Sequence, residues 1–263
     1  MTPVTLETLR GATLDNQLLW LASFGCKVLR TGDVIQVSHP ELPEYVAFLL
    51  VGPAETGLEQ LEQVLVQDRW GTVVPDIYVD NTAVSPALHQ GLTRHGFILA
   101  GKSVNKGSLW RPGAPMSDWA LRAASPQDIG LWASLYSEGF KRVGRDAKID
   151  QERWRLSLET GTAVHHWFIL REGAAVGVFQ SCVAGGVTGI YSFALRPALR
   201  GPGKVLRALR AVRAELTLTG ETFVYFERAK NPDLLDTWMT ADPQARIVVI
   251  RTWMRYRHTS RKQ

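Results

Sequence analysis

A glycine-rich turn between an apolar stretch and a helix-like stretch contains the residues best suited to chemistry in this sequence. The turn, LRPALRGPGKV over residues 195–205, holds two glycines, two prolines, two arginines and a lysine. Glycines let a backbone approach an anion closely, and N–H groups at a helix start form a cradle that the helix dipole strengthens. The turn therefore predicts binding of a phosphate group.

Two common phosphate-binding motifs do not fit this turn. A P-loop, G-x-x-x-x-G-K-[ST], aligned on Gly203 would place Ala198 at its first glycine and Val205 at the hydroxyl residue that holds Mg²⁺. The dinucleotide fingerprint G-x-G-x-x-G accommodates Gly201 but meets Leu206 at its third glycine. Both motifs are excluded, so a phosphate cradle of another kind is needed.

The turn resembles the V-x-P-x-x-R-G-x-G signature of the GNAT superfamily of N-acetyltransferases over residues 195–203. In that family the segment joins the fourth strand to the third helix and wraps the pyrophosphate of acetyl-coenzyme A. The resemblance extends over about residues 117–258 through the order of the expected elements. It implies an acyltransferase that moves an acetyl or other acyl group from acetyl-CoA to an amine, without a metal.

The resemblance also implies where the coenzyme binds. The backbone of residues 193–195 would hold the pantetheine arm, the amides of residues 200–205 would hold the pyrophosphate, and Asn231 would lie near the pantetheine. Three residues depart from the family pattern: Pro202 lacks an amide donor, Val205 replaces a small residue, and Trp238 stands at the usual place of an acidic tyrosine. The expected coenzyme site comprises Phe193, Ala194, Leu195, Arg200, Gly201, Gly203, Lys204, Val205 and Asn231.

Acyl transfer to an amine requires a group that removes a proton from the acceptor. Glu227, at the end of the expected strand ETFVYFE, and Tyr191, on the strand before the turn, are the catalytic candidates. Glu138 is the candidate on the substrate side. Glu227 and Glu138 are equally compatible with surface carboxylates, and Tyr191 is a poor base at its ordinary pKa. His165 and His166 are expected to be structural.

The basic run at residues 141–155 lies where the family shapes its acceptor pocket, which favours an amine acceptor, small molecule or peptide, that bears a carboxylate or a phosphate. Two other functions stay open. A module that binds CoA without catalysis, or regulates, would explain Trp238 and the lack of a clear base. The basic, aromatic tail RTWMRYRHTSRKQ could contact nucleic acid, but a closing strand with a solvated tail explains it better. The sequence leaves a homodimer open.

The second half of the chain predicts a mixed, mostly antiparallel α/β sheet flanked by helices. A strand, WALRAA, precedes a helix that begins near Ser125, and the basic run that follows is expected to be irregular. Three strands follow, joined by turns at residues 172–173 and 185–186. A helix after the glycine-rich turn, the strand ETFVYFE, a short helix from Asn231 and the strand RIVVIRTWMRYR complete the order.

The first half shows a partial echo of this order. The strand YVAFLLV, the helix GLEQLEQVLVQ, the strand VVPDIYVDN, the helix SPALHQGLTRHGF and a hairpin over residues 98–110 are expected. This order predicts a degenerate duplication with two GNAT-like domains, 1–112 and 117–263, joined by a linker rich in proline and glycine at residues 108–119. Only the second domain keeps the coenzyme loop.

Charge and composition agree with this division. Residues 1–116 carry 8 Lys and Arg against 11 Asp and Glu, a net −3, whereas residues 117–263 carry 22 against 14, a net +8, which together give +5. The basic half is where an anionic ligand is expected. With two isolated cysteines, no apolar run of membrane-spanning length and no secretory signal pattern, a cytoplasmic protein without membrane contact is expected.

Overall fold

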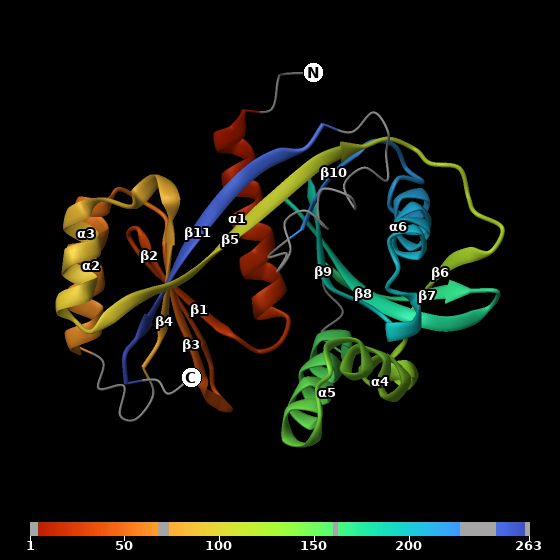
Figure 1. Cartoon of the computed structure of the whole chain (residues 1–263), viewed down its shortest axis with the longest axis horizontal. Coiled ribbons are helices and arrows are strands. Elements are labelled where there is room, and N and C mark those ends of the chain that lie inside the picture. The colour runs from red at the N-terminus through yellow and green to blue at the C-terminus, as the bar shows by residue number, and fades with distance from the viewer. Residues whose placement is uncertain (1–4, 68–73, 160–162, 227–245, 261–263) are drawn as a thin grey trace. The chain divides into compact units, whose positions relative to one another are not determined.

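The computed structural model describes residues 5–67, 74–159, 163–226 and 246–260. Contacts divide the chain into two compact units. One unit comprises residues 1–24 and 105–250, and the other comprises residues 25–104 and 251–263 (Figure 1). Within the described residues, no helix is long and apolar enough to cross a membrane.

The larger unit has the expected mixed, mostly antiparallel sheet. Its strands follow the order β5-β10-β9-β8-β7-β6, and its described neighbours pair antiparallel except β9 and β10, which pair in parallel. The elements of this unit are α1 (Leu6–Ala22), β6 (Trp119–Ala123), α4 (Ile129–Phe140), α5 (Gly144–Glu159), β7 (Val164–Arg171), β8 (Ala174–Ala184), β9 (Val187–Leu195), α6 (Pro202–Leu216), β10 (Thr222–Phe226) and part of β5 (Phe97–Trp110).

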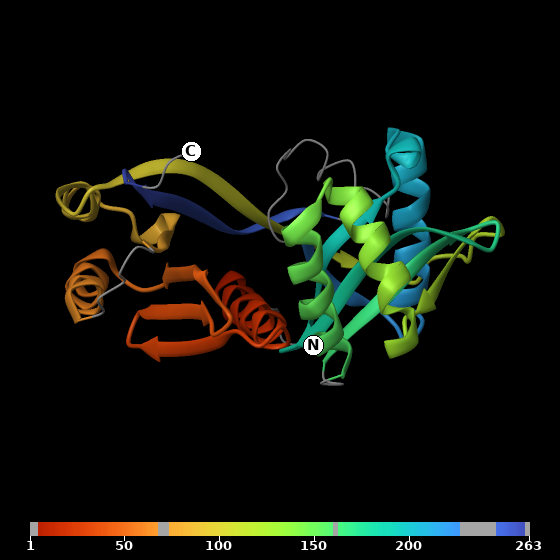
Figure 2. The same ribbon diagram turned by 90° about the horizontal axis from the view of Figure 1, so that it is seen from below.

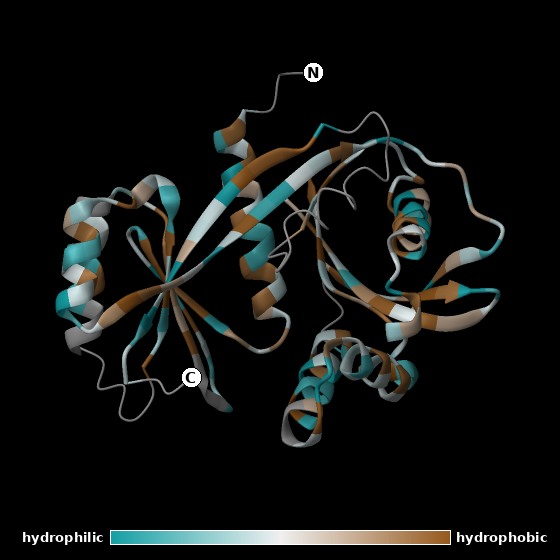
Figure 3. Cartoon of the chain, viewed as in Figure 1, coloured by the Kyte–Doolittle hydropathy of each residue, from teal (hydrophilic) through white to brown (hydrophobic). Residues whose placement is uncertain are grey.

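Helices cover both faces of this sheet. Val205, Leu209 and Val212 of α6 pack in one apolar cluster with strand residues on one face of the sheet, and this one-sided burial accounts for the mixed hydropathy of α6 (Figure 3). Trp132 of α4 and Trp154 of α5 belong to the cluster on the other face. Figures 1 and 2 show the sheet between α6 and the α4–α5 pair, so the glycine-rich turn leads from the sheet into the helix that covers one face.

The two expected hairpins of this unit are confirmed. Glu172 and Gly173 have φ values of 51° and 80°, and Gly185 and Gly186 have values of 59° and 76°. Two successive left-handed residues match the right-handed twist of paired strands, which is why such dipeptides join β7 to β8 and β8 to β9.

The sequence predicted that the basic run at residues 141–155 is irregular. This prediction is wrong, because residues 144–155 belong to helix α5. Arg155 forms ion pairs with Glu152 and Glu159, one turn away on either side. Asp150, which is buried, pairs with Arg142 and Arg153. The pairs within α5 join residues three or four positions apart, a spacing that stabilises a helix, so the charges that obscured the helical pattern help to form α5.

The smaller unit has strands in the order β1-β2-β3-β4-β11. Its core is a separate apolar cluster that includes Phe48, Leu61, Ile77, Leu92 and Tyr256. Its elements are β1 (Lys27–Thr31), β2 (Val34–His39), β3 (Leu42–Leu50), α2 (Ala54–Gln67), β4 (Asp76–Asp80), α3 (Pro86–Arg94) and parts of β5 and β11 (Val248–His258).

Both halves of the chain repeat one topological unit and exchange their last strands. In each half, a helix connects two parallel strands: α2 connects β3 to β4, and α6 connects β9 to β10. The last strand of the first half, β5, pairs with β10, and the last strand of the second half, β11, pairs with β4. The compact units therefore mix segments of both halves. The domains 1–112 and 117–263 stay a prediction about repeat units.

The hairpin expected over residues 98–110 is wrong, because this segment is part of the single strand β5. The glycines that indicated a turn have another role. A β-carbon on Gly107 would lie within 3 Å of Phe223 and Ile250, so this glycine admits the neighbouring side chains. The strand also takes up the first residues of the predicted linker, 108–110.

Helix α1 is attached to the larger unit through a buried asparagine. Asn16 Nδ2 donates to the carbonyl oxygens of Cys182, at 2.8 Å, and Val187, at 3.1 Å. Its Oδ1 accepts from the hydroxyl groups of Tyr191 and Tyr225, each at 3.0 Å. All four hydrogen-bonding positions of the amide are thus used, and they join α1 to β8, β9 and β10.

Replacing Asn16 by leucine is expected to destabilise the protein, since buried carbonyl and hydroxyl groups would lose a partner at about 1–3 kcal/mol each. We expect the free energy of unfolding to fall by at least about 2 kcal/mol, measured by urea denaturation. The control is Gly11→Ala, at an exposed position of α1 with open space around it, which should stabilise by about 0.5–1 kcal/mol. An Asn16→Leu variant as stable as the parent would contradict the role of Asn16.

Candidate functional site

Strand β9 is interrupted by a bulge just before the glycine-rich turn. Tyr191 lies opposite Gln180 and Ala194 lies opposite Val178, so two residues of β9 span a single residue of β8. Ser192, in the bulge, has a φ of 54°. Bulges bend a strand and take backbone groups out of the ladder. The parallel register of β9 with β10 runs from Val187 to Ile190, so the bulge begins where this described pairing ends.

Of the three residues expected to hold the pantetheine, Phe193 lies in this bulge, and Ala194 and Leu195 follow it. Phe193 is half-buried, whereas Ala194 and Leu195 are buried. Helix α4 approaches them closely, because a β-carbon on Gly139 would lie 2.5 Å from the β-carbon of Ala194. A glycine at this position therefore sets how near the end of α4 lies to the end of β9.

Arg200 ties the glycine-rich turn to its surroundings. Its Nε donates to the carbonyl oxygen of Leu195 at 3.1 Å, and its Nη2 donates to the carbonyl oxygen of Gly139. The guanidinium thus joins the end of β9 to the end of α4. These bonds give Arg200 a structural role in shaping the turn.

The backbone donors of the turn are fewer than the six residues 200–205 suggest. Pro202 has no N–H, and Arg200 donates its own to Pro197 at 3.3 Å. The amides of Lys204 and Val205 donate to the carbonyl oxygen of Gly201, at 2.9 and 3.0 Å. The amides of Gly201 and Gly203 are left, within the described residues, as the donors that the turn can offer to an anion. The side chain of Val205 is buried in the core cluster between α6 and the sheet.

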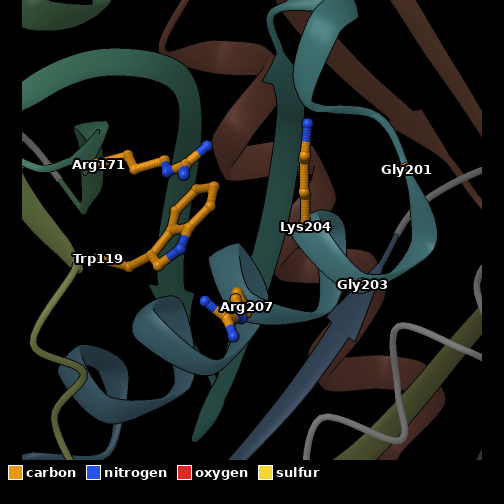
Figure 4. A pocket seen from close by; sticks show the side chains of 6 residues that line it. All are labelled: Trp119, Arg171, Gly201, Gly203, Lys204 and Arg207. Atoms are coloured by element: carbon orange, nitrogen blue, oxygen red, sulfur yellow. The ribbon is translucent and has the colours of Figure 1, made fainter.

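A pocket of about 460 Å³ lies beside the start of α6 (Figure 4). Lys204 Nζ donates to the carbonyl oxygen of Ala198 at 3.0 Å, and Arg207 pairs with Asp118 at 3.1 Å. Sequence reasoning missed two of the lining residues, Trp119 of β6 and Arg171 of β7, because only the sheet brings them near the turn. The pocket is lined by Trp119, Arg171, Gly201, Gly203, Lys204 and Arg207.

Tyr191 is enclosed by the protein. Its ring stacks on Trp20 at 4.2 Å between centroids, and only 3% of the residue is exposed. Its hydroxyl group donates to Asn16 Oδ1 and lies against the hydroxyl of Tyr225. A catalytic role would require these bonds to be exchanged for a bond to substrate, and it stays a prediction.

The remaining candidates lie at the surface or outside the described residues. Glu138 is exposed near the end of α4 and lies 3.5 Å from Arg196 Nε, so it is near the start of the turn. Glu227, Asn231 and Trp238 lie outside the described residues. Among the described residues, no group of three or more His, Cys, Asp or Glu side chains could hold a metal ion.

His166 is buried against the aromatic rings of Trp132 and Trp154. Gln180 Nε2 donates to its Nε2 at 2.7 Å, which places the proton of the neutral ring on Nδ1. Burial, and to a lesser extent the nearby charge of His165, lowers the pKa of His166 to about 3. This ring is therefore neutral near pH 7 and contributes to the core.

Stability should consequently decrease in acid. The unfolded chain protonates His166 near pH 6.5, whereas the folded chain does so only near pH 3, so folding loses free energy as the pH falls between these values. In urea denaturation at pH 6.5 and 5, His166→Gln should lessen this decrease by about 2 kcal/mol. The control is His165→Gln, at the exposed neighbouring residue, which should show the same decrease in stability as the parent protein. Equal pH dependence in both variants would contradict the assignment to His166.

The fold of the whole chain is found in solved structures. No family model matches the sequence, and no curated protein matches it. A GCN5-related N-acetyltransferase from Kribbella flavida is 11% identical, with a TM-score of 0.63 over 99% of this chain and 98% of that chain. A conserved protein of unknown function from Staphylococcus epidermidis is 11% identical, with a TM-score of 0.60 over 88% and 93%. A GCN5-related N-acetyltransferase from Sphaerobacter thermophilus is 16% identical, with a TM-score of 0.54 over 87% and 81%. At these identities the likeness shows the fold alone, and the chain has the fold of the GNAT superfamily.

Proposed function

We propose that this protein is an acyltransferase that transfers an acetyl or other acyl group from acetyl-CoA to an amine. The observation that carries the proposal is the succession of the β9 bulge, the glycine-rich turn and the start of α6 on a GNAT fold. The amides of Gly201 and Gly203, with the positive end of the α6 dipole, suit a pyrophosphate. The backbone of residues 193–195 suits the pantetheine, because it lies beyond the last described pairing of β9 with β10, at Ile190.

The chemistry asked of this site is modest. Acetyl-CoA supplies an activated acyl thioester, which a neutral amine attacks as a C–N bond forms and the C–S bond breaks. Backbone N–H groups released by the bulge would stabilise the negative charge that develops on the carbonyl oxygen. Glu138 is adjacent in sequence to Gly139, which contacts β9, so we place it on the acceptor side of the site. Glu227 and Tyr191 stay the proposed proton-transferring groups.

The acceptor is proposed as a small-molecule or peptide amine. A preference for an anionic acceptor would rest on the basic run at residues 141–155, and most of its described arginines are engaged within the protein. Arg142 and Arg153 pair with Asp150, and Arg155 pairs with two glutamates. These ion pairs remove the support for an anionic acceptor from the three arginines. On sequence grounds we place the reaction in the cytoplasm.

The first half of the chain is proposed to be a degenerate GNAT-like half without a coenzyme site. Its connection from β3 to α2 comprises residues 51–53, whereas residues 196–201 connect β9 to α6. The carboxylate of Asp33 fills the space beside Gly52 and accepts from Thr56 Oγ1 at 2.9 Å. A carboxylate already lies at the start of α2, and it would repel a phosphate there.

Calorimetry with CoA, together with thiol release from acetyl-CoA over a broad panel of amines, tests this function. Gly203→Glu should reduce CoA affinity at least tenfold, because it places a negative charge at the proposed pyrophosphate site. The matched control is Gly130→Glu. Both glycines are exposed in the first turn of a helix with open space around them, and the control should bind CoA as the parent does.

The outcomes separate the candidate functions. Turnover with any amine supports the acyltransferase, and CoA binding without turnover would instead indicate a CoA-binding or regulatory module. A parent protein that binds no CoA would contradict both. Salt-sensitive oligonucleotide affinity that survives Gly203→Glu would indicate nucleic-acid binding.

A further inference from the structure

The pocket beside α6 has donors that the proposed pyrophosphate cradle does not use. Trp119 lines it with 3% of its surface exposed, and its Nε1–H has no acceptor among the described residues. Figure 4 shows the indole nitrogen on the side of the ring that faces Arg207 and α6. A buried N–H without a partner is unfavourable. An acceptor atom of a ligand in this pocket would satisfy it.

Arg171 provides a second donor on the same wall. Its guanidinium carbon lies 6.0 Å from the centre of the Trp119 ring, and its Nε is buried with no acceptor in the described part of the chain. One of its terminal nitrogens lies 3.7 Å from the exposed carboxylate of Glu172, a distance too long for a hydrogen bond. The β6–β7 side of the pocket thus presents one neutral and one charged donor.

The charges around the pocket favour an anion. Lys204 and Arg207 face Trp119 and Arg171 from α6 (Figure 4). Two carboxylates, Asp118 beside Arg207 and Glu172 beside Arg171, compensate part of this charge. Three cations against two carboxylates leave one net positive charge, and the start of α6 adds its dipole.

We propose that this pocket binds a phosphomonoester group. Trp119 Nε1–H and Arg171 Nε–H would donate hydrogen bonds to it, and the positive charge of Lys204 would attract it. A phosphomonoester dianion has several oxygen atoms that accept hydrogen bonds and no group that must donate one, which matches a pocket wall made of donors. A volume of about 460 Å³ is larger than one phosphate, so the group would arrive attached to a larger molecule.

One source of this group is favoured, and here the inference rests on the proposed function. CoA carries a 3′-phosphomonoester on the same molecule as the pyrophosphate assigned to Gly201 and Gly203. These two glycines also line the pocket, so a single ligand could use both sets of donors. A separate phosphorylated molecule or free phosphate is the other source of the same chemistry.

Calorimetric titration with CoA, dephospho-CoA and inorganic phosphate distinguishes the sources. The parent should bind CoA at least tenfold more tightly than dephospho-CoA. Trp119→Phe, which removes the N–H and keeps an aromatic ring, and Arg171→Gln should each lower CoA affinity about tenfold. Both variants should leave dephospho-CoA affinity unchanged within twofold.

Two control variants make the same substitutions outside the pocket. Trp110→Phe alters another buried tryptophan of the same core cluster whose Nε1 has no acceptor in the described structure, and Arg210→Gln alters an exposed arginine of α6. Neither residue lines the pocket. Both controls should bind CoA and dephospho-CoA as the parent does. Urea denaturation verifies that every variant is folded.

Each result decides the proposal. If CoA and dephospho-CoA bind equally but inorganic phosphate binds and is lost in Trp119→Phe and Arg171→Gln, the phosphate pocket stands with a separate ligand. If neither the preference for CoA over dephospho-CoA nor the binding of inorganic phosphate depends on Trp119 and Arg171, the proposal is overturned. A protein that binds neither form of CoA defeats the proposed function, and the inorganic phosphate titration still tests the pocket.

Discussion

The four hydrogen bonds of Asn16 are the interaction on which the geometry of the larger unit depends. They join α1 to three adjacent strands, and one of them ends on Tyr191, the last residue of β9 before the bulge. In a buried setting such a network is strongly favoured only when every member is paired, which is the case for this amide. The first helix of the chain thus stabilises the strand that leads into the candidate site.

From that strand onward, the site is shaped by close backbone approaches. Gly139 lets α4 lie against Ala194, and Arg200 bonds to the carbonyl oxygens at both sides of this contact. The result is a turn with few backbone donors left unused, those of Gly201 and Gly203 among the described residues. A pocket whose other side is formed by β6 and β7 adds Trp119 and Arg171. The proposed coenzyme would therefore be held by fewer amides and more side chains than the turn alone suggests.

The two halves of the chain surround the start of the same connecting helix with different charges. Each has a helix that starts after a strand and leads to a parallel neighbour. In the first half, the Asp33 carboxylate lies beside the short connection into α2, so the helix start already has a negative partner. In the second half, the longer turn with its lysine leaves a pocket with net positive charge. The exchange of β5 and β11 joins the halves through backbone pairing.

Several features follow from local sequence and others do not. The strands of the second half, the left-handed hairpin turns and the amphipathic α6 are predictable, because periodicity and turn residues act within a few positions. Helix α1 has no clear apolar stripe, because Thr13, Asn16 and Gln17 lie on its buried face. The glycines of β5 indicated a turn, yet Gly107 admits packing from distant strands. Charge pairs of α5 looked like an irregular basic run.

The sequence by itself determined the fold class and the turn at residues 195–205, because short-range patterns and a spaced set of glycines carry that information. Tertiary structure alone decided which donors face the pocket, why Tyr191 is enclosed, and that each half completes its sheet with the last strand of the other. These properties depend on contacts between residues far apart in the chain, such as Trp119 with α6 and Asn16 with Tyr225. No local pattern records them, since the free energy that selects such contacts comes from packing the whole sheet.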